Sequence, residues 1–230
     1  MTTILAIDTA TTACSVALSH KGEVRQEFID TPREHTRLVL PMVDKLLALA
    51  DIPLARVDAL AFTCGPGSFT GLRIGFGVIQ GLAFGGNIPV IPVSTLKVMA
   101  HRAMREMSLQ EGLVVPALDA RMNEIYWGIY QVVGGSVEAH RADTVSTPEE
   151  ALAAMTGPVN AGVGDGWSLL KPHSMPPSRV NTALTPDARS IIDIAHPLFV
   201  DGAAKPVERI ELSYIRNEVS WKKRQKIRQP

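Results

Sequence analysis

The first thirty residues alternate short apolar runs with breaks made of small and polar residues. The runs cover residues 3–8, 13–20 and 22–30 and are rich in residue types suited to strands. The sequence DTATT at 8–12 separates the first two runs, and Lys21-Gly22 marks a turn between the second and the third. The pattern predicts three short strands, of which the last two form a hairpin.

Beyond residue 34 the apolar spacing changes to steps of three and four, which place one broad stripe on a helix over residues 35–50. The stripe consists of Leu38, Val39, Met42, Val43, Leu46, Leu47 and Ala50. Further along, residues 57–65 and 88–94 are predicted as strands, and residues 70–84 and 95–107 as helices. This order favours an α/β fold of ribonuclease H-like type, in which helices cover both faces of a mixed sheet.

The second half of the chain repeats this plan. Residues 113–140 again form an apolar strand ending in Asp, a longer strand, a Gly turn and a third strand, with Asp119 in the place of Asp8. A helix from Thr147, a strand at 157–164, an irregular Pro-rich stretch at 171–186 and a helix at 187–196 are expected to follow.

The repeated plan predicts a duplicated ribonuclease H-like fold, as in actin-like ATPases, with two mixed-sheet subdomains at 1–105 and 106–212. Residues 213–230 are predicted as a last helix that packs back on the first subdomain. From Arg216 onward the tail carries six basic residues against Glu218, a net charge of +5. The tail is interpreted either as a complement to the helix dipole or as an anchor for an acidic partner or RNA.

Composition argues against direct reading of nucleic acid. Hydrophobic residues make up 46% and charged residues 20%, as in an ordinary folded soluble protein. The 23 basic and 23 acidic residues cancel, so no overall field attracts nucleic acid or anionic lipid. Aromatic residues are only 5%, which leaves few platforms for stacking bases.

The chain carries two cysteines, Cys14 and Cys64, without C-x-x-C spacing. They are interpreted as small buried thiols of a reducing compartment. The N-terminus lacks a basic region, Asp8 interrupts its apolar run, and no apolar run approaches the ~18 residues of a membrane span. A cytoplasmic location without a membrane anchor is therefore expected.

The glycine-rich segment 64–86 contains GPGSFTG, which matches neither of two nucleotide-binding motifs. No Lys-Ser/Thr pair follows the last Gly, as a P-loop requires, and Thr70 stands where G-x-G-x-x-G needs its third Gly. Backbone amides at the start of the following helix can still bind an anion. The weak cofactor-binding candidates are Asp8, Thr9, Gly65, Gly67 and Ser68.

The search for catalytic and metal-binding residues gives no candidate. Ser68 is not in a G-x-S-x-G elbow, because the next Gly comes one position late, and a helix cap is the simpler role. Nothing in the sequence places His35 beside it. No two of the six His residues have metal-type spacing, so neither a metal site nor a nucleophile is expected.

Glycines continue inside the predicted second helix at Gly71, Gly75, Gly77, Gly81 and Gly85. Each interior glycine costs about 1 kcal/mol relative to Ala, so close approach by another element is expected in compensation. Two explanations stay open: packing on the chain's own sheet, or contact with another subunit. The second predicts a partner interface formed by His35, Leu38, Met42, Leu46, Leu72, Gly75 and Ile79.

Three segments together resemble the TsaB (YeaZ) branch of the Gcp-like family, the bacterial tRNA threonylcarbamoyladenosine proteins. They are ILAIDTATTACSVAL, GPGSFTGLRIGFGVIQGLAF and PALDARMNEIYWGIY, and YIRNEVSWKK resembles the family's C-terminal helix. The resemblance covers most of the first 130 residues, with little that is specific between about 135 and 210. It implies an actin-like double domain without complete catalytic equipment.

The resemblance also implies partners. Family members pair with the larger paralogue TsaD, which is expected to hold ATP and metal and to modify adenosine 37 of tRNAs reading ANN codons. TsaE joins that complex and TsaC supplies the threonylcarbamoyl-adenylate. The chain is thus expected to be a non-catalytic scaffold and activator without a firmly bound cofactor, and the same helices could pair two copies in a homodimer.

An autonomous enzyme, either a peptidase or an ATP-dependent kinase-like protein, is the alternative function. TsaD carries a His-x-x-x-His pair after the strand that follows GPGSFTG, whereas the corresponding segment here, PVSTLKVMAHRAM, has one His. That departure removes the metal site and favours the scaffold. An assay of the purified chain with ATP and with peptide substrates distinguishes the two.

Overall fold

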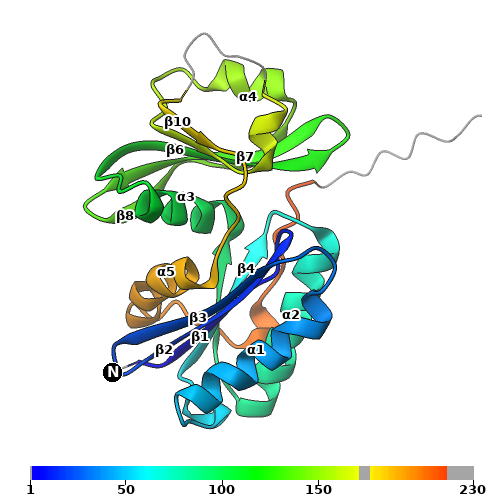
Figure 1. The fold of residues 1–230 in the computed structure, drawn as a ribbon, viewed down its shortest axis with the longest axis vertical. Coiled ribbons are helices and arrows are strands. Elements are labelled where there is room, and N and C mark those ends of the chain that lie inside the picture. The colour runs from blue at the N-terminus through cyan, green and yellow to red at the C-terminus, as the bar shows by residue number, and fades with distance from the viewer. Residues whose placement is uncertain (1, 171–176, 217–230) are drawn as a thin grey trace, which may run out of the picture.

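The computed structural model describes residues 2–170 and 177–216, which form two five-stranded mixed sheets with helices around them (Figure 1). The first sheet has the order β3-β2-β1-β4-β5 and the second the order β10-β9-β6-β7-β8. The strands of the first are β1 (Ile4–Asp8), β2 (Ala13–His20), β3 (Glu23–Asp30), β4 (Ala59–Gly65) and β5 (Val90–Ser94). Those of the second are β6 (Glu111–Arg121), β7 (Glu124–Val133), β8 (Ser136–Ser146), β9 (Ala161–Val163) and β10 (Arg179–Asn181).

The two sheets have the same topology. In each, three antiparallel strands come first, and two further strands then run parallel to the first strand of the set. The order 3-2-1-4-5 in the first sheet corresponds to 8-7-6-9-10 in the second. The predicted duplicated α/β fold is therefore confirmed.

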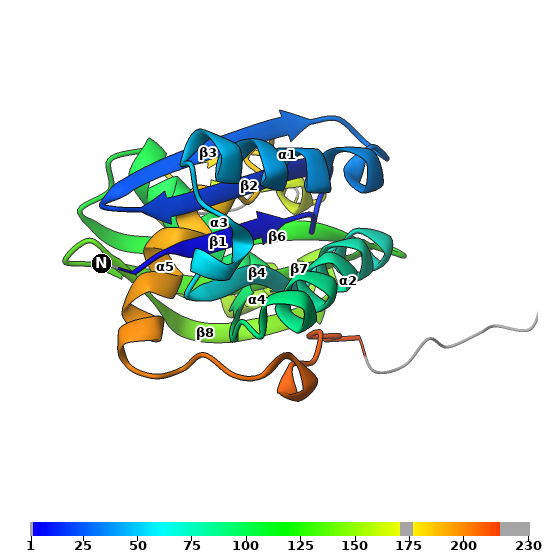
Figure 2. The same ribbon diagram turned by 90° about the horizontal axis from the view of Figure 1, so that it is seen from below.

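Helices α1 (His35–Leu49) and α2 (Phe69–Gly86) cover one face of the first sheet, and α5 (Ala188–Val200) covers the other. Helix α3 (Thr95–Glu106) lies between the two sheets, and α4 (Pro148–Ala154) lies on the far side of the second (Figure 1). Viewed from below, α1 and α2 are on the side of the molecule that faces the viewer (Figure 2). None of the helices in the described ranges has the length and hydropathy needed to cross a membrane.

Helix boundaries follow from capping residues. Ser68, Ser94, Thr147 and Asp187 each precede a helix and accept a hydrogen bond from a backbone N–H of its first turn. Glu150 completes a capping box with Thr147 at the start of α4. Helix α2 ends at Asn87, whose left-handed backbone (φ 50°) is a common helix stop.

Two helices pack on the sheet that is formed by the other half of the sequence. Most of the buried side chains of α3 pack on the second sheet, although the helix was assigned to 1–105. Conversely, α5 belongs to 106–212 by sequence but packs its Ile191, Ile192 and Ala195 on the first sheet. Each sheet thus buries one face beneath a helix from the other half of the sequence.

Near the C-terminus the structure departs from two of the predicted elements. The Pro-rich stretch is not wholly irregular, because the short strand β10 lies within it. Residues 213–216 are described and are not helical, which corrects the start of the predicted last helix. The remainder of that helix and its basic tail lie outside the described residues.

Candidate functional site

Asp8 ends β1 as a fully buried carboxylate. Its Oδ1 accepts hydrogen bonds from Thr63 Oγ1 (2.7 Å) and from the Ala10 N–H (3.2 Å), whereas its Oδ2 is buried without a partner among the described residues. Burial in this apolar site raises the pKa of Asp8 to about 6. The topologically equivalent Asp119 is partly exposed and forms an ion pair with Arg121 (3.0 Å).

Helix α5 covers the sheet beside this carboxylate. Ser15 lies opposite Asp8 in the β1–β2 ladder, and its Oγ accepts a hydrogen bond from the Ala188 N–H (2.8 Å) at the start of α5. Asp187, the N-cap of α5, is itself only 3% exposed. Reaching Asp8 from this side would require α5 to move.

The glycine loop before α2 is filled by the chain's own backbone. The Ser68 N–H donates to the Ala10 carbonyl (2.7 Å), and a Cβ added at Gly67 would overlap the same oxygen. On the other side, Ser213 donates its N–H to the Cys64 carbonyl (2.8 Å), and its own carbonyl oxygen lies only 2.5 Å from the position that a Cβ at Gly65 would take. Gly65 also has a φ of +119°, a conformation that suits glycine.

The cofactor candidates therefore lie close together, and the polar side chains of Asp8, Thr9 and Ser68 are hydrogen-bonded to other groups of the chain. Thr9 is buried, and its Oγ1 donates to the Gly71 carbonyl (2.8 Å). Ser68 Oγ accepts from the Gly71 N–H (3.2 Å) as a helix cap, the role that its sequence context predicts. His35 Nε2 lies 3.0 Å from the Thr11 carbonyl oxygen, so this nitrogen has a backbone partner. In the described ranges, no three His, Cys, Asp or Glu side chains converge as metal ligands.

The glycines of α2 form two stripes. A Cβ at Gly71 or Gly75 would overlap atoms of Thr9, so these two glycines let the β1–β2 loop pack against the helix. Gly77, Gly81 and Gly85 have open space at the same position. The first explanation, packing within the chain, thus holds for Gly71 and Gly75, whereas contact of Gly77, Gly81 and Gly85 with another subunit stays a prediction.

Gly77 and Gly81, from the stripe with open space, line a groove of about 430 Å³ between α1 and α2. We call this the α1–α2 groove, and it is lined by Thr36, Val39, Leu40, Arg73, Ile74, Gly77, Val78, Gly81 and Leu82. Its accessible lining is mainly apolar, and Leu40 is 46% exposed. Phe84, three residues beyond Gly81 on the same helix, is 62% exposed.

Most residues of the predicted partner interface are buried inside this chain and cannot form an exposed surface. His35, Met42, Leu46, Leu72, Gly75 and Ile79 are buried inside this chain, and Leu38 is half-buried against the core. Their apolar stripe packs on the first sheet. The surface that α1 and α2 leave open is the adjacent face, which contains the α1–α2 groove.

No sequence pattern pointed to a partly buried polar network around Asp143. Asp143 on β8 accepts hydrogen bonds from Ser94 Oγ and from Tyr130 OH, both at 2.5 Å. Burial raises the pKa of Asp143. The network joins the end of β5 to the second sheet, and only its non-local geometry, not the sequence spacing, reveals it.

Comparisons with known proteins identify relatives along nearly the whole chain. A family model described as TsaD, tRNA N6-adenosine threonylcarbamoyltransferase, matches residues 29–180. The tRNA threonylcarbamoyladenosine biosynthesis protein TsaB of Escherichia coli is 43% identical over 226 residues, which cover 96% of this chain and 97% of that protein. TsaB of Haemophilus influenzae is 40% identical, with 96% of each chain covered. The solved structure of YeaZ from Pseudomonas aeruginosa has a TM-score of 0.86 at 38% identity, covering 93% of this chain and all of that one.

The two glycine stripes predict opposite effects of the same substitution. Gly75→Ala should destabilise the fold by about 1–3 kcal/mol, because its Cβ displaces the buried Thr9 side chain. Gly77→Ala meets open space and should stabilise the fold by up to about 1 kcal/mol through helix propensity. Urea unfolding followed by circular dichroism measures both. Equal effects of the same sign would contradict the two-stripe assignment.

Replacing the buried Asp8 by a neutral side chain should raise the free energy of unfolding at neutral pH but not at acidic pH. The folded pKa of Asp8 lies above the unfolded value, so its contribution to stability is complete below about pH 4 and is lost as the pH rises through about 6. A shift of about two units corresponds to about 3 kcal/mol of destabilisation at neutral pH. Asp8→Asn should therefore be more stable than the parent at pH 7.5.

At pH 4 this gain should vanish. Thermal unfolding of the parent and of Asp8→Asn at pH 4 and pH 7.5 measures the difference. The exposed Asp201→Asn is the control. A variant less stable than the parent at pH 7.5 would instead mean that the Asp8 carboxylate is stabilised as an anion.

Proposed function

The chain belongs to the TsaB (YeaZ) family of tRNA threonylcarbamoyladenosine biosynthesis proteins, and from that premise we propose that it is a non-catalytic subunit of this pathway. In this proposal it binds and activates a TsaD-type catalytic subunit through the α1–α2 groove. The observation that carries the proposal is the pair of glycine stripes on α2. One stripe, Gly71 and Gly75, lets the chain's own β1–β2 loop pack against α2, while the other, Gly77 and Gly81, lines a groove open to the outside.

The groove has the character of a helix-docking surface. Glycines at positions 77 and 81 leave room for large side chains of a facing helix, and Leu40, Ile74, Val78 and Leu82 supply apolar contacts. Exposed apolar surface of this kind on a soluble domain commonly marks an interaction site. Arg73 at the groove also stacks on the exposed Phe69 ring at 3.7 Å, and Arg and aromatic residues are enriched at interface hot spots.

Family membership supports the choice of partner. The TsaD family model matches a segment of this chain that contains both α1 and α2, so a TsaD-type protein is expected to carry equivalent helices. Two similar helix pairs can meet about a pseudo-twofold axis in a four-helix contact. Without that partner, a second copy of this chain could occupy the same face as an isologous homodimer.

The rest of the proposed assembly follows from this placement. ATP and metal would be held by the TsaD-type subunit, TsaE would join the complex, and TsaC would supply the threonylcarbamoyl donor. The product would be N6-threonylcarbamoyladenosine at position 37 of tRNAs reading ANN codons, made in the cytoplasm, with tRNA bound by the whole complex. The alternative, an autonomous peptidase or kinase-like enzyme, finds little support in a glycine loop filled by Ala10 and Ser213.

Filling the groove tests the proposed docking surface. Gly81→Leu should stay folded, because its side chain meets open space, but should weaken binding to the TsaD-type protein of the same organism. A loss of about 2 kcal/mol or more is expected for a central contact. Calorimetry measures the binding, and circular dichroism checks that the variant is folded.

Gly157→Leu is the matched control, since that loop glycine also has open space and belongs to the second sheet's side of the molecule. It should bind the partner as the parent does. If the folded Gly81→Leu variant also retains parental affinity, the partner uses another surface.

A further inference from the structure

Among the described residues that line the α1–α2 groove, Arg73 alone carries a charge. It lies four residues before Gly77, which in turn lies four before Gly81, so the three share one face of α2. The rest of the wall consists of apolar side chains, the two glycines and Thr36. A helix that fills the groove therefore meets one positive charge, at the end where α2 begins.

The Arg73 guanidinium is held in place by two aromatic side chains. Its Cζ lies 3.7 Å from the centre of the Phe69 ring, and its Nε donates to the Tyr214 hydroxyl at 3.2 Å. Tyr214 comes from the C-terminal segment, and its ring packs against Phe69 with the ring centres 5.7 Å apart. An arginine that is already ordered loses less side-chain entropy on binding than a mobile one.

The terminal nitrogens of Arg73 remain available to a ligand. The residue is exposed, and within the ranges 2–170 and 177–216 it forms no ion pair with an Asp or Glu. Glu34, the N-cap residue of α1, is paired with Arg37 at 3.3 Å. Neither α1 nor α2 has an acidic side chain in its first turn, so the helix dipoles leave this end of the groove positive.

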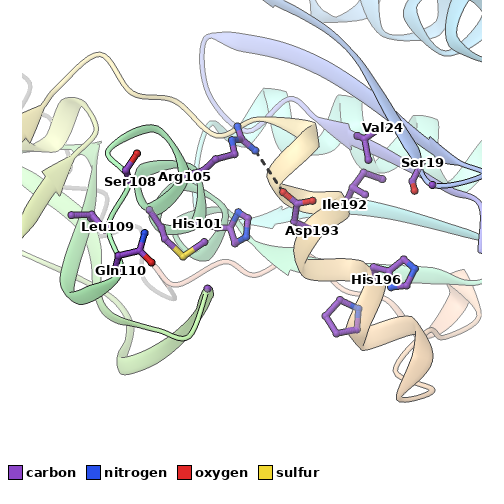
Figure 3. Close-up of a pocket in the computed structure, with 14 residues that line it drawn as sticks. Ser19, Val24, His101, Arg105, Ser108, Leu109, Gln110, Ile192, Asp193 and His196 are labelled. Carbon is purple, nitrogen blue, oxygen red and sulfur yellow. Dashed lines mark ion pairs between the residues drawn. The ribbon is translucent and has the colours of Figure 1, made fainter.

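The larger crevice between α3 and α5 is the contrasting case (Figure 3). It has a volume of about 810 Å³, and Arg105 in its wall lies 2.5 Å from the buried Asp187 and 3.7 Å from Asp193. The charge of Arg105 is thus neutralised inside the chain. The described part of the chain therefore supplies carboxylates to Arg105 but none to Arg73.

We propose that Arg73 is the charged anchor of the α1–α2 groove and receives a carboxylate side chain of the docking partner. The two Nη groups form a planar fork that fits both oxygens of an Asp or Glu. The partner segment is an apolar helix with an acid at the end that faces the start of α2. This inference rests on the proposed function, and it adds the chemistry by which the TsaD-type partner is recognised.

Arg73→Met tests the anchor, because it keeps a long side chain and removes the charge. With the TsaD-type protein of the same organism, calorimetry should show binding weakened about tenfold or more, as for other close charge pairs at interfaces. Arg189→Met is the matched control, since Arg189 is exposed on α5, which covers the opposite face of the first sheet. It should bind as the parent does. Circular dichroism checks that both variants are folded.

A double-mutant cycle separates pairing with a carboxylate from a general loss of fit. Each Asp and Glu on the partner's surface helices is changed in turn to Asn or Gln and measured against the parent and against Arg73→Met. One of these changes should weaken binding to the parent about tenfold and have little further effect on Arg73→Met. The gap in affinity between the parent and Arg73→Met should also narrow as salt rises from about 50 mM to about 500 mM.

Parental affinity of the folded Arg73→Met variant, while Gly81→Leu weakens binding, would overturn the anchor and leave the docking surface intact. Fully additive effects for every acid in the cycle would overturn it in the same way. If the parent does not bind the partner, or if Gly81→Leu binds as tightly as the parent, the proposed docking through the groove fails and the anchor with it.

Discussion

The contact between the β1–β2 loop and helix α2 fixes the shape of the glycine-rich loop and the direction in which α2 presents its second glycine stripe. Thr9 bonds to the Gly71 carbonyl, Ala10 accepts from Ser68, and Gly67, Gly71 and Gly75 have no Cβ to prevent the approach. The loop therefore occupies the place in which free amides of the helix start could hold an anion. The same contact sets the rotation of α2, so that its second glycine stripe faces outward beside α1.

Local patterns were sufficient to predict most of the fold. Sequence patterns predicted strands at β1–β9 and helices at α1–α5, and the repeat of the strand–Asp–hairpin plan indicated the duplication. The exchange of α3 and α5 between the sheets was not predicted, because it depends on contacts between residues far apart in sequence. Strand β10 has three residues, too few to show a period.

The sequence grouped Asp8, Thr9 and the GPGSFTG loop as weak cofactor-binding candidates, and that role stays a prediction. It could not show that Thr9 bonds to the Gly71 carbonyl or that Asp8 accepts from Thr63 and Ala10, because these contacts join residues from separate elements. The broad apolar stripe of α1 was assigned to a partner, whereas Met42 and Leu46 are core residues. A stripe predicts that a helix face is buried, and spacing alone does not say whether the covering surface belongs to the same chain.

We propose that the open face of α1 and α2 receives a TsaD-type partner. Amide hydrogen exchange of the chain, measured with and without that partner, shows which helices become covered. Binding through this face should slow exchange in α1 and α2 and leave exchange in α3, α4 and α5 unchanged. Protection confined to the second sheet and α4, with α1 and α2 unchanged, would contradict it.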